Sequence, residues 1–213
     1  MVRTVKKPEE RKLEIVKAAR FLFRTKEYDK TSMQDIIEHL GIAKGTVYYY
    51  FSSKEELLEA VVDDIIDESV EKMQKLIDES DGNALEKMRL LVSAGNMADD
   101  NDEVLLQLHY GGNFEMHARL LVTAIQKQAP LYARIFQEGC EEGLFQTDTP
   151  LETAEFILTA VQLLTDVGIY PWTEETLTRR VRAIPALIER QLKASPGSFQ
   201  FLFPQISRNG ETK

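Results

Sequence analysis

Apolar residues recur at every third or fourth position along most of the chain, whereas the strict alternation that marks a half-buried strand is scarce. The first such stretch spans residues 8–26, and its expected inward face consists of Leu13, Ile15, Val16, Ala19, Leu22 and Phe23. Because this spacing places side chains on one face of a helix, the pattern predicts an all-α protein of about nine helices.

Glycine, proline and short polar runs separate the predicted helices. After residues 8–26, we expect helices close to residues 32–40, 43–51, 54–77, 84–97, 103–110, 113–142, 151–169 and 174–192. Pro130 is expected to kink or divide the seventh helix, and Pro185 to bend the ninth. Residues 151–169 are apolar on most sides, which predicts a helix that is buried all round.

The predicted helices group into a head, a body and a tail. A three-helix head at residues 1–52 continues without a flexible linker into a larger helical body at residues 53–195. The tail, residues 196–213, contains Pro and Gly and is expected to be loosely ordered. It also contains Phe199, Phe201 and Phe203, whose rings are candidates for docking it onto the body.

Within the head, two short helices are joined by a tight turn at residues 40–42. The first begins at a T-x-x-Q capping-box pattern that runs from Thr31 to Gln34, in which Ser32 serves equally well as the cap. Gly41 ends this helix, since glycine adopts the left-handed conformation at little steric cost. This is the spacing of a helix-turn-helix, whose second helix enters the major groove of DNA.

Three tyrosines and a phenylalanine, Tyr48 to Phe51, occupy the end of the second short helix. Consecutive side chains point about 100° apart, so one core cannot bury all four. Val47 and Phe51 share the inward face, which leaves the tyrosines facing outward or sideways. Outward tyrosine hydroxyls suit a sugar-phosphate backbone. The alternative is that the rings cap a small core and the neighbouring Lys44 and Lys54 are merely solvated.

The charge of the chain is distributed unevenly. Residues 1–50 contain eleven Lys and Arg and seven Asp and Glu, a net charge of +4. The remaining 163 residues contain 15 Lys and Arg and 28 Asp and Glu, a net charge of −13, so the net charge of the whole chain is −9. A basic head on an acidic body is the footprint expected of a protein that binds phosphates, with chance unevenness as the alternative.

Other functional classes have little support in the sequence. We find no Gly-rich phosphate loop, nucleophile elbow or zinc spacing, so neither an enzyme nor a cofactor is expected. His109, Glu115 and His117 are close in sequence, but the last two lie on different helix faces, so no metal site is expected. A single cysteine, no apolar run near the length of a membrane span and no secretory signal make the cytoplasm the expected location.

The stretch TSMQDIIEHLGIAKGTVYYYFSSKEELLEAVV, Thr31 to Val62, resembles the DNA-binding signature of the tetracycline-repressor (TetR) family of bacterial transcription regulators. The passage EGCEEGLFQTDTPLETAEFIL also resembles the family's approach to its eighth helix. The resemblance implies a repressor that binds a pseudo-palindromic DNA operator as a dimer. It also implies release of that repressor by a small, largely hydrophobic effector.

Carried over position by position, the resemblance implies roles for nine residues of the head. The base contacts would come from Lys44, Gly45 and Tyr49, with Gln34 joining them. The phosphate contacts would come from Ser32, Thr46, Tyr48, Tyr50 and Lys54. These roles are chemically consistent, because lysine reaches guanine acceptors and glycine lets the backbone approach the bases.

For the body, the resemblance implies a homodimer through the last two helices and an effector pocket. The dimer candidates are Phe156, Ile157, Ala160, Val161, Leu164, Val167, Leu177, Val181, Ile184 and Ile188, with an intramolecular core as the alternative. The pocket candidates are polar or apolar residues in apolar surroundings, namely Met97, His109, Phe114, His117, Gln162, Thr165 and Asp166. An alternative function is a regulator of the same fold controlled by a protein partner, which exposed apolar residues at 199–203 would favour.

Overall fold

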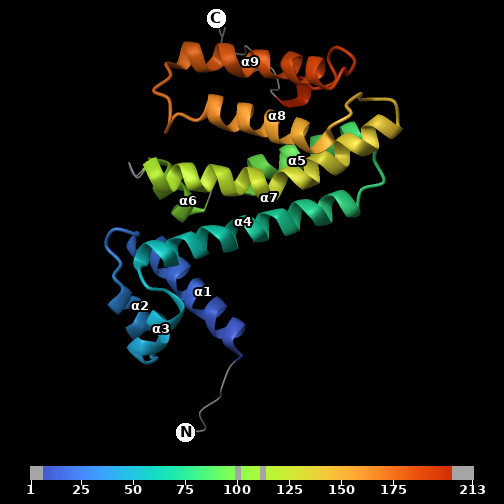
Figure 1. Ribbon diagram of the computed structural model, residues 1–213. Coiled ribbons are helices and arrows are strands. Elements are labelled where there is room, and N and C mark those ends of the chain that lie inside the picture. Colours follow the sequence, from blue (N-terminus) through green and yellow to red (C-terminus); the bar gives the residue numbers. More distant parts are fainter. Residues whose placement is uncertain (1–6, 99–101, 111–113, 203–213) are drawn as a thin grey trace, which may run out of the picture. The chain divides into compact units, whose positions relative to one another are not determined.

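The computed structural model describes residues 7–98, 102–110 and 114–202. These residues form nine α-helices and contain no strand, so the predicted all-α class is confirmed (Figure 1). The elements are α1 (Pro8–Lys26), α2 (Met33–Leu40), α3 (Lys44–Tyr50), α4 (Lys54–Asp78), α5 (Ala84–Ala98), α6 (Glu103–Tyr110), α7 (Phe114–Glu141), α8 (Pro150–Thr165), α9 (Glu174–Gln191) and the 3-10 helix η1 (Gln200–Leu202). None of these described helices is both long enough and apolar enough to cross a membrane.

The chain forms two compact units, and neither is continuous in sequence. The first combines residues 1–69 with residues 98–123, and the second combines residues 70–97 with residues 124–213. Helices α4 and α7 therefore contribute to both units. The head boundary expected at residue 52 falls inside the first unit, because α6 packs against α1 and the buried start of α4 belongs to the same unit.

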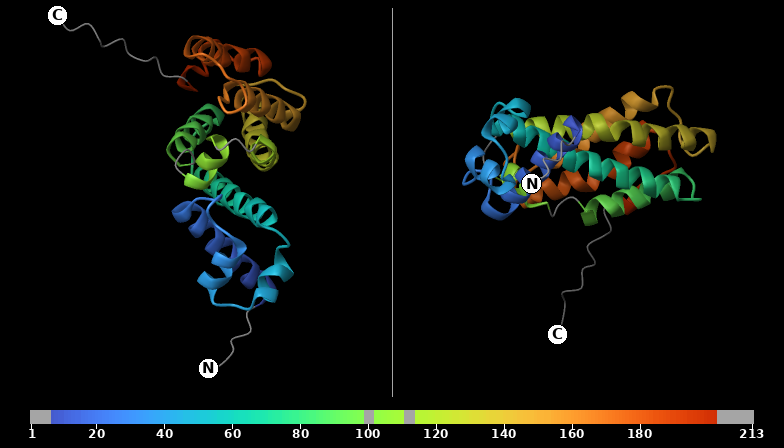
Figure 2. Two further views of the ribbon diagram at one scale, coloured as in Figure 1. Left: turned by 90° about the vertical axis from the view of Figure 1, so that its left-hand side faces the viewer. Right: turned by 90° about the horizontal axis from the view of Figure 1, so that it is seen from below.

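In the first unit, α1, α2 and α3 pack around a common core with the start of α4. Figure 2 shows α1, α2 and α3 packed together from two further directions. Their buried apolar side chains, with those of the start of α4, are Ile15, Val16, Ala18, Ala19, Phe23, Ile36, Ile37, Val47, Phe51, Leu57, Leu58, Val61 and Val62. The expected inward position of Leu13 is wrong, since its side chain is 43% exposed. The reason is that the buried face of α1 is centred on Ile15, Ala19 and Phe23, and Leu13 lies on a different side of the helix.

Charged side chains connect α1 to α4 and α6 inside the first unit. Arg20 donates from Nη1 to Glu68 at 2.8 Å and from Nη2 to Asp102 at 3.0 Å, and Asp64 lies 3.6 Å from Nη1. The other carboxylate oxygen of Asp102, Oδ1, accepts the backbone N–H of Val104 at 2.9 Å, at the start of α6. Arg20 therefore ties the beginning of α6 to the middle of α1.

The second unit has its own apolar core, built from α5, the later part of α7, α8, α9 and the end of α4. The sequence left open whether Pro130 kinks or divides the seventh helix, and the structure shows one uninterrupted helix. Pro130 itself is exposed, while its neighbours Ala129 and Leu131 are buried and anchor both sides of the proline to the core. Pro185 likewise lies within a continuous α9.

Helix α8 differs from its predicted form in length and in exposure. It ends at Thr165, because the buried carboxylate of Asp166 accepts the N–H groups of Gly168 and Ile169 at 2.7 and 2.9 Å and turns the chain. Burial all round is wrong as well, since Phe156 is 62% exposed and Leu164 is 44% exposed. One face of α8 is thus free of the unit's own core.

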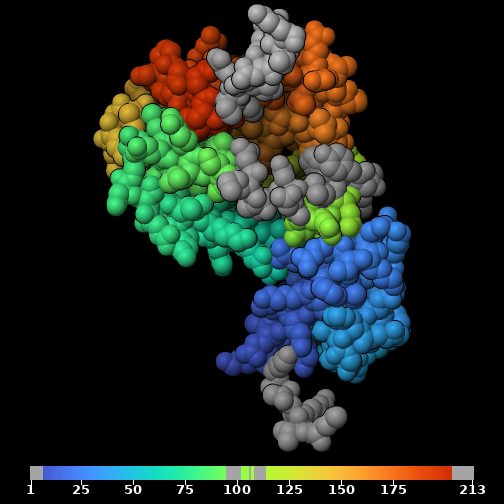
Figure 3. Space-filling model, turned by 180° about the vertical axis from the view of Figure 1, so that it is seen from behind, coloured from blue at the N-terminus to red at the C-terminus, as the bar shows by residue number. Residues whose placement is uncertain are grey.

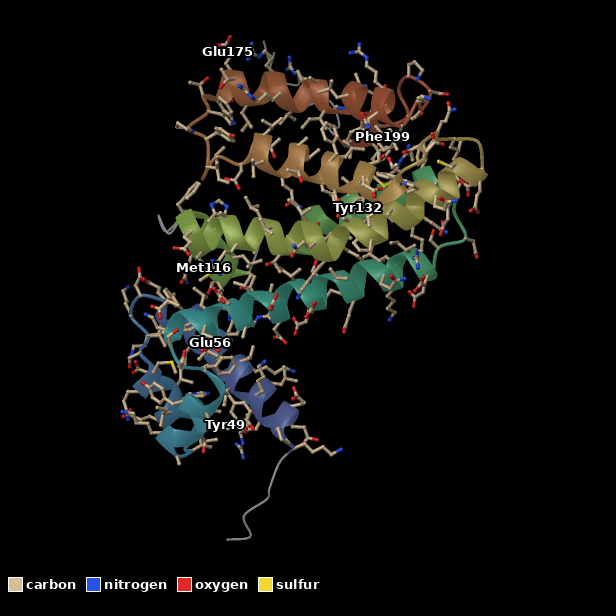
Figure 4. The ribbon with its side chains drawn as sticks, viewed as in Figure 1. Tyr49, Glu56, Met116, Tyr132, Glu175 and Phe199 are labelled. Atoms are coloured by element: carbon tan, nitrogen blue, oxygen red, sulfur yellow. The ribbon has the colours of Figure 1, made fainter. Side chains whose placement is uncertain are left out.

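The beginning of the tail is part of the second core. Phe199 is fully buried, packs against the rings of Phe145 and Phe201, and donates its backbone N–H to the buried Glu189 at 3.0 Å. Figure 4 shows Phe199 beside α8 and α9. Docking by rings was correctly expected, whereas the loose order expected from residue 196 onward is wrong for residues 196–202. Phe203 lies outside the described residues.

The link after α1 contains a strained residue. Glu27 adopts φ 68° and ψ 150°, a combination that is essentially restricted to glycine. The turn that follows holds it there, because the Thr31 hydroxyl donates to the Glu27 carbonyl at 2.7 Å and the Thr31 N–H donates to the Tyr28 carbonyl at 3.1 Å. The strain is therefore opposed by hydrogen bonds of the adjoining residues.

We predict that Glu27→Gly raises the free energy of unfolding by about 1 kcal/mol, because glycine relieves a backbone strain of about that size. Glu27→Ala is the matched control, since it also removes the exposed ion pair with Lys30 but keeps the Cβ atom. Urea unfolding followed by circular dichroism measures both variants. Equal stabilisation by glycine and alanine would show that the charge and not the backbone is responsible.

Candidate DNA-binding surface

The start of α2 is fixed by a reciprocal cap between Ser32 and Asp35. The Ser32 hydroxyl accepts the N–H of Asp35 at 3.2 Å, and the Asp35 carboxylate accepts the N–H of Ser32 at 2.7 Å. The ammonium of Lys26, 2.6 Å away, and the two donors of Ser32 hold the pKa of Asp35 well below its usual range. Asp35 is therefore ionised at neutral pH, and this cap weakens only when the pH falls far enough to protonate it.

Gly41 makes the turn between the two short helices. It adopts φ 61° and ψ 30°, the left-handed conformation, and its N–H donates to the carbonyls of Ile37 and Glu38. A Cβ atom at this position would meet nothing within 4 Å, so the backbone conformation alone accounts for the glycine. The predicted turn is confirmed at this residue.

Helix α3 has one buried face and one exposed face. Val47 is fully buried and Phe51, which directly follows the helix, is 2% exposed. Tyr48 is 41% exposed and Tyr49 is 81% exposed, and Figure 4 shows Tyr49 at the surface of α3. Tyr50 is partly buried, and its ring meets the Tyr49 ring edge-on at 5.1 Å. The tyrosines therefore face outward or sideways, as the sequence predicted.

The front of α3 carries an exposed cation and an exposed glycine. The Lys44 ammonium lies 5.4 Å from the centroid of the Tyr48 ring, one helical turn further along. Gly45 has ordinary helical geometry, and a Cβ atom built on it would meet nothing within 4 Å. Among the described residues no neighbour requires glycine here, and the missing side chain leaves the front of α3 open to close approach. In Figure 3 the light-blue atoms, which include those of α3, form part of the surface of the first unit.

At the start of α4, Lys54 is half-buried. Its Nζ donates to the carbonyl of Tyr28 at 3.1 Å and lies 4.1 Å from the centroid of the Tyr28 ring. Nearby, Ser53 accepts the N–H of Glu56 at 3.1 Å, while the Glu56 carboxylate accepts the N–H and hydroxyl of Ser52, which lower the pKa of Glu56. The beginning of α4 is thus capped, and Lys54 is held in one place.

The remaining candidates of the head show mixed availability. Ser32 is exposed, but its hydroxyl is engaged with Asp35. Gln34 is exposed and donates to Glu38 at 2.7 Å, and Thr46 is partly buried. Their DNA contacts stay predictions, as do those of the other candidate residues.

The candidate pocket residues are spread over the two units. In the first unit, His117 is buried, while Phe114 is 62% exposed and lines a surface hollow of about 520 Å³ between α4 and α7. In the second unit, the hydroxyl of Thr165 donates to the carbonyl of Val161, and Asp166 accepts the backbone bonds already described. The side chains of Met97 and His109 lie outside the described residues.

Gln162 is a pocket candidate whose side-chain oxygen has no hydrogen-bond partner among the described residues. It donates from Nε2 to the Gln128 Oε1 at 3.3 Å, and its own Oε1 is buried without a partner among the described residues. A buried acceptor in this state favours any bound molecule that brings a donor.

Three residues that shape this surface were missed in the sequence. Asp35 could have been found, because Ser32 and Asp35 match the S-x-x-D form of the capping box. Tyr28 and Gln107 could not, since their contact joins positions 79 residues apart and no local pattern announces it. Gln107 accepts the N–H of Tyr28 at 3.0 Å and donates to the carbonyl of Phe23 at 3.3 Å.

These features define the class of protein. Two short helices joined at a left-handed glycine, the second anchored by the buried Val47 and Phe51 and exposed at Lys44, Gly45, Tyr48 and Tyr49, make a helix-turn-helix DNA-binding unit.

Comparisons with known proteins identify the family. The sequence model of the bacterial regulatory proteins of the tetR family matches residues 15–61, and that of the tetracyclin repressor-like C-terminal domain matches residues 96–187. The HTH-type transcriptional regulator YfiR of Bacillus subtilis is 29% identical over 164 residues, covering 70% of this chain and 76% of the relative. The HTH-type transcriptional repressor KstR2 of Mycolicibacterium smegmatis is 25% identical over 153 residues, covering 70% and 74%.

Solved structures have the same fold. A transcriptional regulator from Cytophaga hutchinsonii superposes with a TM-score of 0.61 at 25% identity, covering 85% of this chain and 97% of that one. RolR in complex with resorcinol superposes with a TM-score of 0.64 at 17% identity, covering 92% and 95%, and this likeness concerns the fold alone. The chain belongs to the TetR family of bacterial transcription regulators. It is accordingly a DNA-binding transcriptional regulator and not an enzyme.

We predict that Gly45→Ala stabilises the free protein by roughly 0.5–1 kcal/mol through better helix propensity, yet weakens its binding to DNA, because a methyl group then stands between α3 and the bases. Gly41→Ala is the matched control and should lower stability by about 1 kcal/mol, since its φ is positive. Thermal unfolding and fluorescence anisotropy with labelled duplex DNA measure the two effects. Unchanged DNA affinity in Gly45→Ala would contradict close approach at this residue.

Proposed function

We propose that this protein is a ligand-responsive repressor that binds a pseudo-palindromic operator as a homodimer and is released by a small, largely hydrophobic effector. The observation that carries the proposal is the two-sided construction of α3. Val47 and Phe51 bury one face, while Lys44, Gly45 and Tyr49 stand exposed on the rest of the helix. Such a helix is suited to enter a major groove without disturbing the core.

In this proposal the bases are contacted by Lys44, Gly45, Tyr49 and Gln34. The phosphates are contacted by Ser32, Thr46, Tyr48, Tyr50 and Lys54. The exposure of Lys44, Tyr48 and Tyr49 supports these roles directly. The half-buried Lys54 supports its role in another way, because it is already ordered at the capped start of α4. The KstR2 relative is named as a repressor, which supports repression as the output.

The exposed apolar residues of the second unit support dimerisation through α8 and α9. Of its six exposed large apolar side chains in the described ranges, all but Leu90 lie on α8, on α9 or directly after α8: Leu151, Phe156, Leu164, Val167 and Leu187. Phe156, Ala160 and Leu164 recur every four residues and share one helix face. By contrast, Ile157, Ile184 and Ile188 are buried within the unit, so the dimer candidates divide between the interface and the core.

A small-molecule effector is supported by two observations. Gln162 carries a buried acceptor within a mostly apolar unit, and a protein of the same fold, RolR, was solved with resorcinol bound. The alternative of a protein partner depended on exposed apolar residues at 199–203, but Phe199 is fully buried and Phe201 is partly buried. An effector would release DNA by binding more tightly to a conformation whose two heads do not fit both half-sites.

We predict that Lys44→Ala weakens binding to the operator by about 1–3 kcal/mol and relaxes base choice at one position of each half-site. The operator is obtained by selection from random duplex DNA with the unaltered protein, and anisotropy titrations over a range of salt measure affinity. Lys75→Ala, which removes the same charge from the second unit, is the control and should keep the base preference. An unchanged preference in Lys44→Ala would refute base readout by α3.

We predict that Phe156→Glu converts the dimer to monomers, because a charge would be buried at the centre of the interface without a partner. Leu90→Glu is the matched control, since Leu90 is also an exposed apolar residue of the second unit but lies on α5. Sedimentation velocity measures the oligomeric state. A dimer that survives Phe156→Glu would exclude this face of α8.

A further inference from the structure

A chain of contacts leads from α6 to the start of α4 through the turn after α1. Its first member, Gln107 of α6, uses both ends of its amide group. Nε2 donates to the carbonyl of Phe23 at 3.3 Å, and Oε1 accepts the N–H of Tyr28 at 3.0 Å. A single side chain thus forms hydrogen bonds with the last turn of α1 and with the turn that follows it.

Tyr28 in turn contacts Lys54 through both its carbonyl and its ring. The carbonyl of Tyr28 accepts a hydrogen bond from the Lys54 Nζ at 3.1 Å, and the ring of Tyr28 lies under the same ammonium at 4.1 Å from its centroid. The ring is itself fixed, because its edge packs on Phe23 at 5.1 Å. The strained Glu27 immediately before it sets the direction in which the Tyr28 peptide points.

This arrangement orders Lys54 through an uncharged carbonyl and an uncharged ring. Burial, followed by the charges of Glu55 and Asp29, raises the pKa of Tyr28 to about 12, so the group under the ammonium is a neutral ring. An ammonium has three N–H donors, and the Tyr28 carbonyl takes one of them, which leaves two for a phosphate. A lysine held in this way loses less side-chain freedom when it binds than a lysine that swings in solvent.

We propose that Gln107 is a positioning residue for DNA binding, which holds Lys54 in place for a phosphate through Tyr28. The inference rests on the proposed function, since it takes from there the phosphate contact of Lys54. Gln107 lies in the stretch that the C-terminal family model matches, residues 96–187, although it packs within the first unit. The C-terminal part of the sequence therefore supplies a residue that supports the position of Lys54.

A double-mutant cycle on the full-length protein tests this inference. The variants are Gln107→Met, which keeps the length of the side chain but removes both hydrogen-bonding ends, Lys54→Met, and the two together. The probe is the duplex selected with the unaltered protein. Gln107→Met should weaken binding about three- to tenfold, the loss expected for one hydrogen bond of ordinary strength. In the Lys54→Met background the same change should have almost no effect.

The salt dependence of binding separates positioning from mere stability. A plot of log affinity against log salt concentration has a negative slope. Lys54→Met should make this slope shallower by about one per head, and Gln107→Met should also make it shallower. Tyr28→Phe is the control: it keeps the ring and the backbone bonds, so its slope should not change. Thermal unfolding checks that each variant is folded, and Gln107→Asn, one methylene too short for both contacts, replaces Gln107→Met if the latter does not fold.

The outcomes separate the inference from the function on which it rests. If the unaltered protein binds no duplex in a salt-sensitive way, the proposed function fails. If it binds, but Gln107→Met weakens binding equally with and without Lys54, Gln107 acts only on the stability of the head and the inference is wrong. The inference is supported if the effects of Gln107→Met and Lys54→Met on DNA affinity are coupled and Gln107→Met makes the salt dependence shallower.

Discussion

The structure of the head depends on the burial of one face of a very short helix. Helix α3 has seven residues, too few to persist alone in water, so its stability comes from packing. Val47 and Phe51, four residues apart, supply that packing and fix the rotation of the helix about its axis. Once these two are buried, Lys44 and Tyr49 have no place in the core. The exposure of Lys44 and Tyr49 is thus a consequence of how α3 is anchored.

The same head is also held by residues that arrive from much later in the sequence. Arg20 binds Asp102 at the start of α6, and Gln107 in the middle of α6 binds the peptide of Tyr28. These contacts explain why residues 98–123 belong to the compact unit of the head. They also link the C-terminal part of the sequence to Lys54, because one side chain of α6 binds the turn whose Tyr28 carbonyl accepts a hydrogen bond from Lys54.

In the second unit, α8 and α9 carry both buried and exposed apolar side chains. Ile157 of α8 and Ile184 and Ile188 of α9 face the unit's own core, which Phe199 of the tail completes. Phe156 and Leu164 project from another face of α8 and remain exposed. A helix that is apolar on most sides therefore serves two contacts at once, one within the chain and, in the proposed dimer, one with a second copy.

The sequence by itself determined the helices, their order, the left-handed turn at Gly41 and the outward direction of Tyr49, because these follow from local spacing and from the conformational freedom of single residues. It also carried the family resemblance, through the motif from Thr31 to Val62. Only the tertiary structure decided that Leu13 is exposed, that Phe156 is free while Ile157 is buried, that Phe199 fills the core and that Gln107 reaches Tyr28. Each of these depends on which surfaces meet after folding, and an apolar residue at helical spacing has the same pattern whether its partner is the chain's own core, a second copy or water.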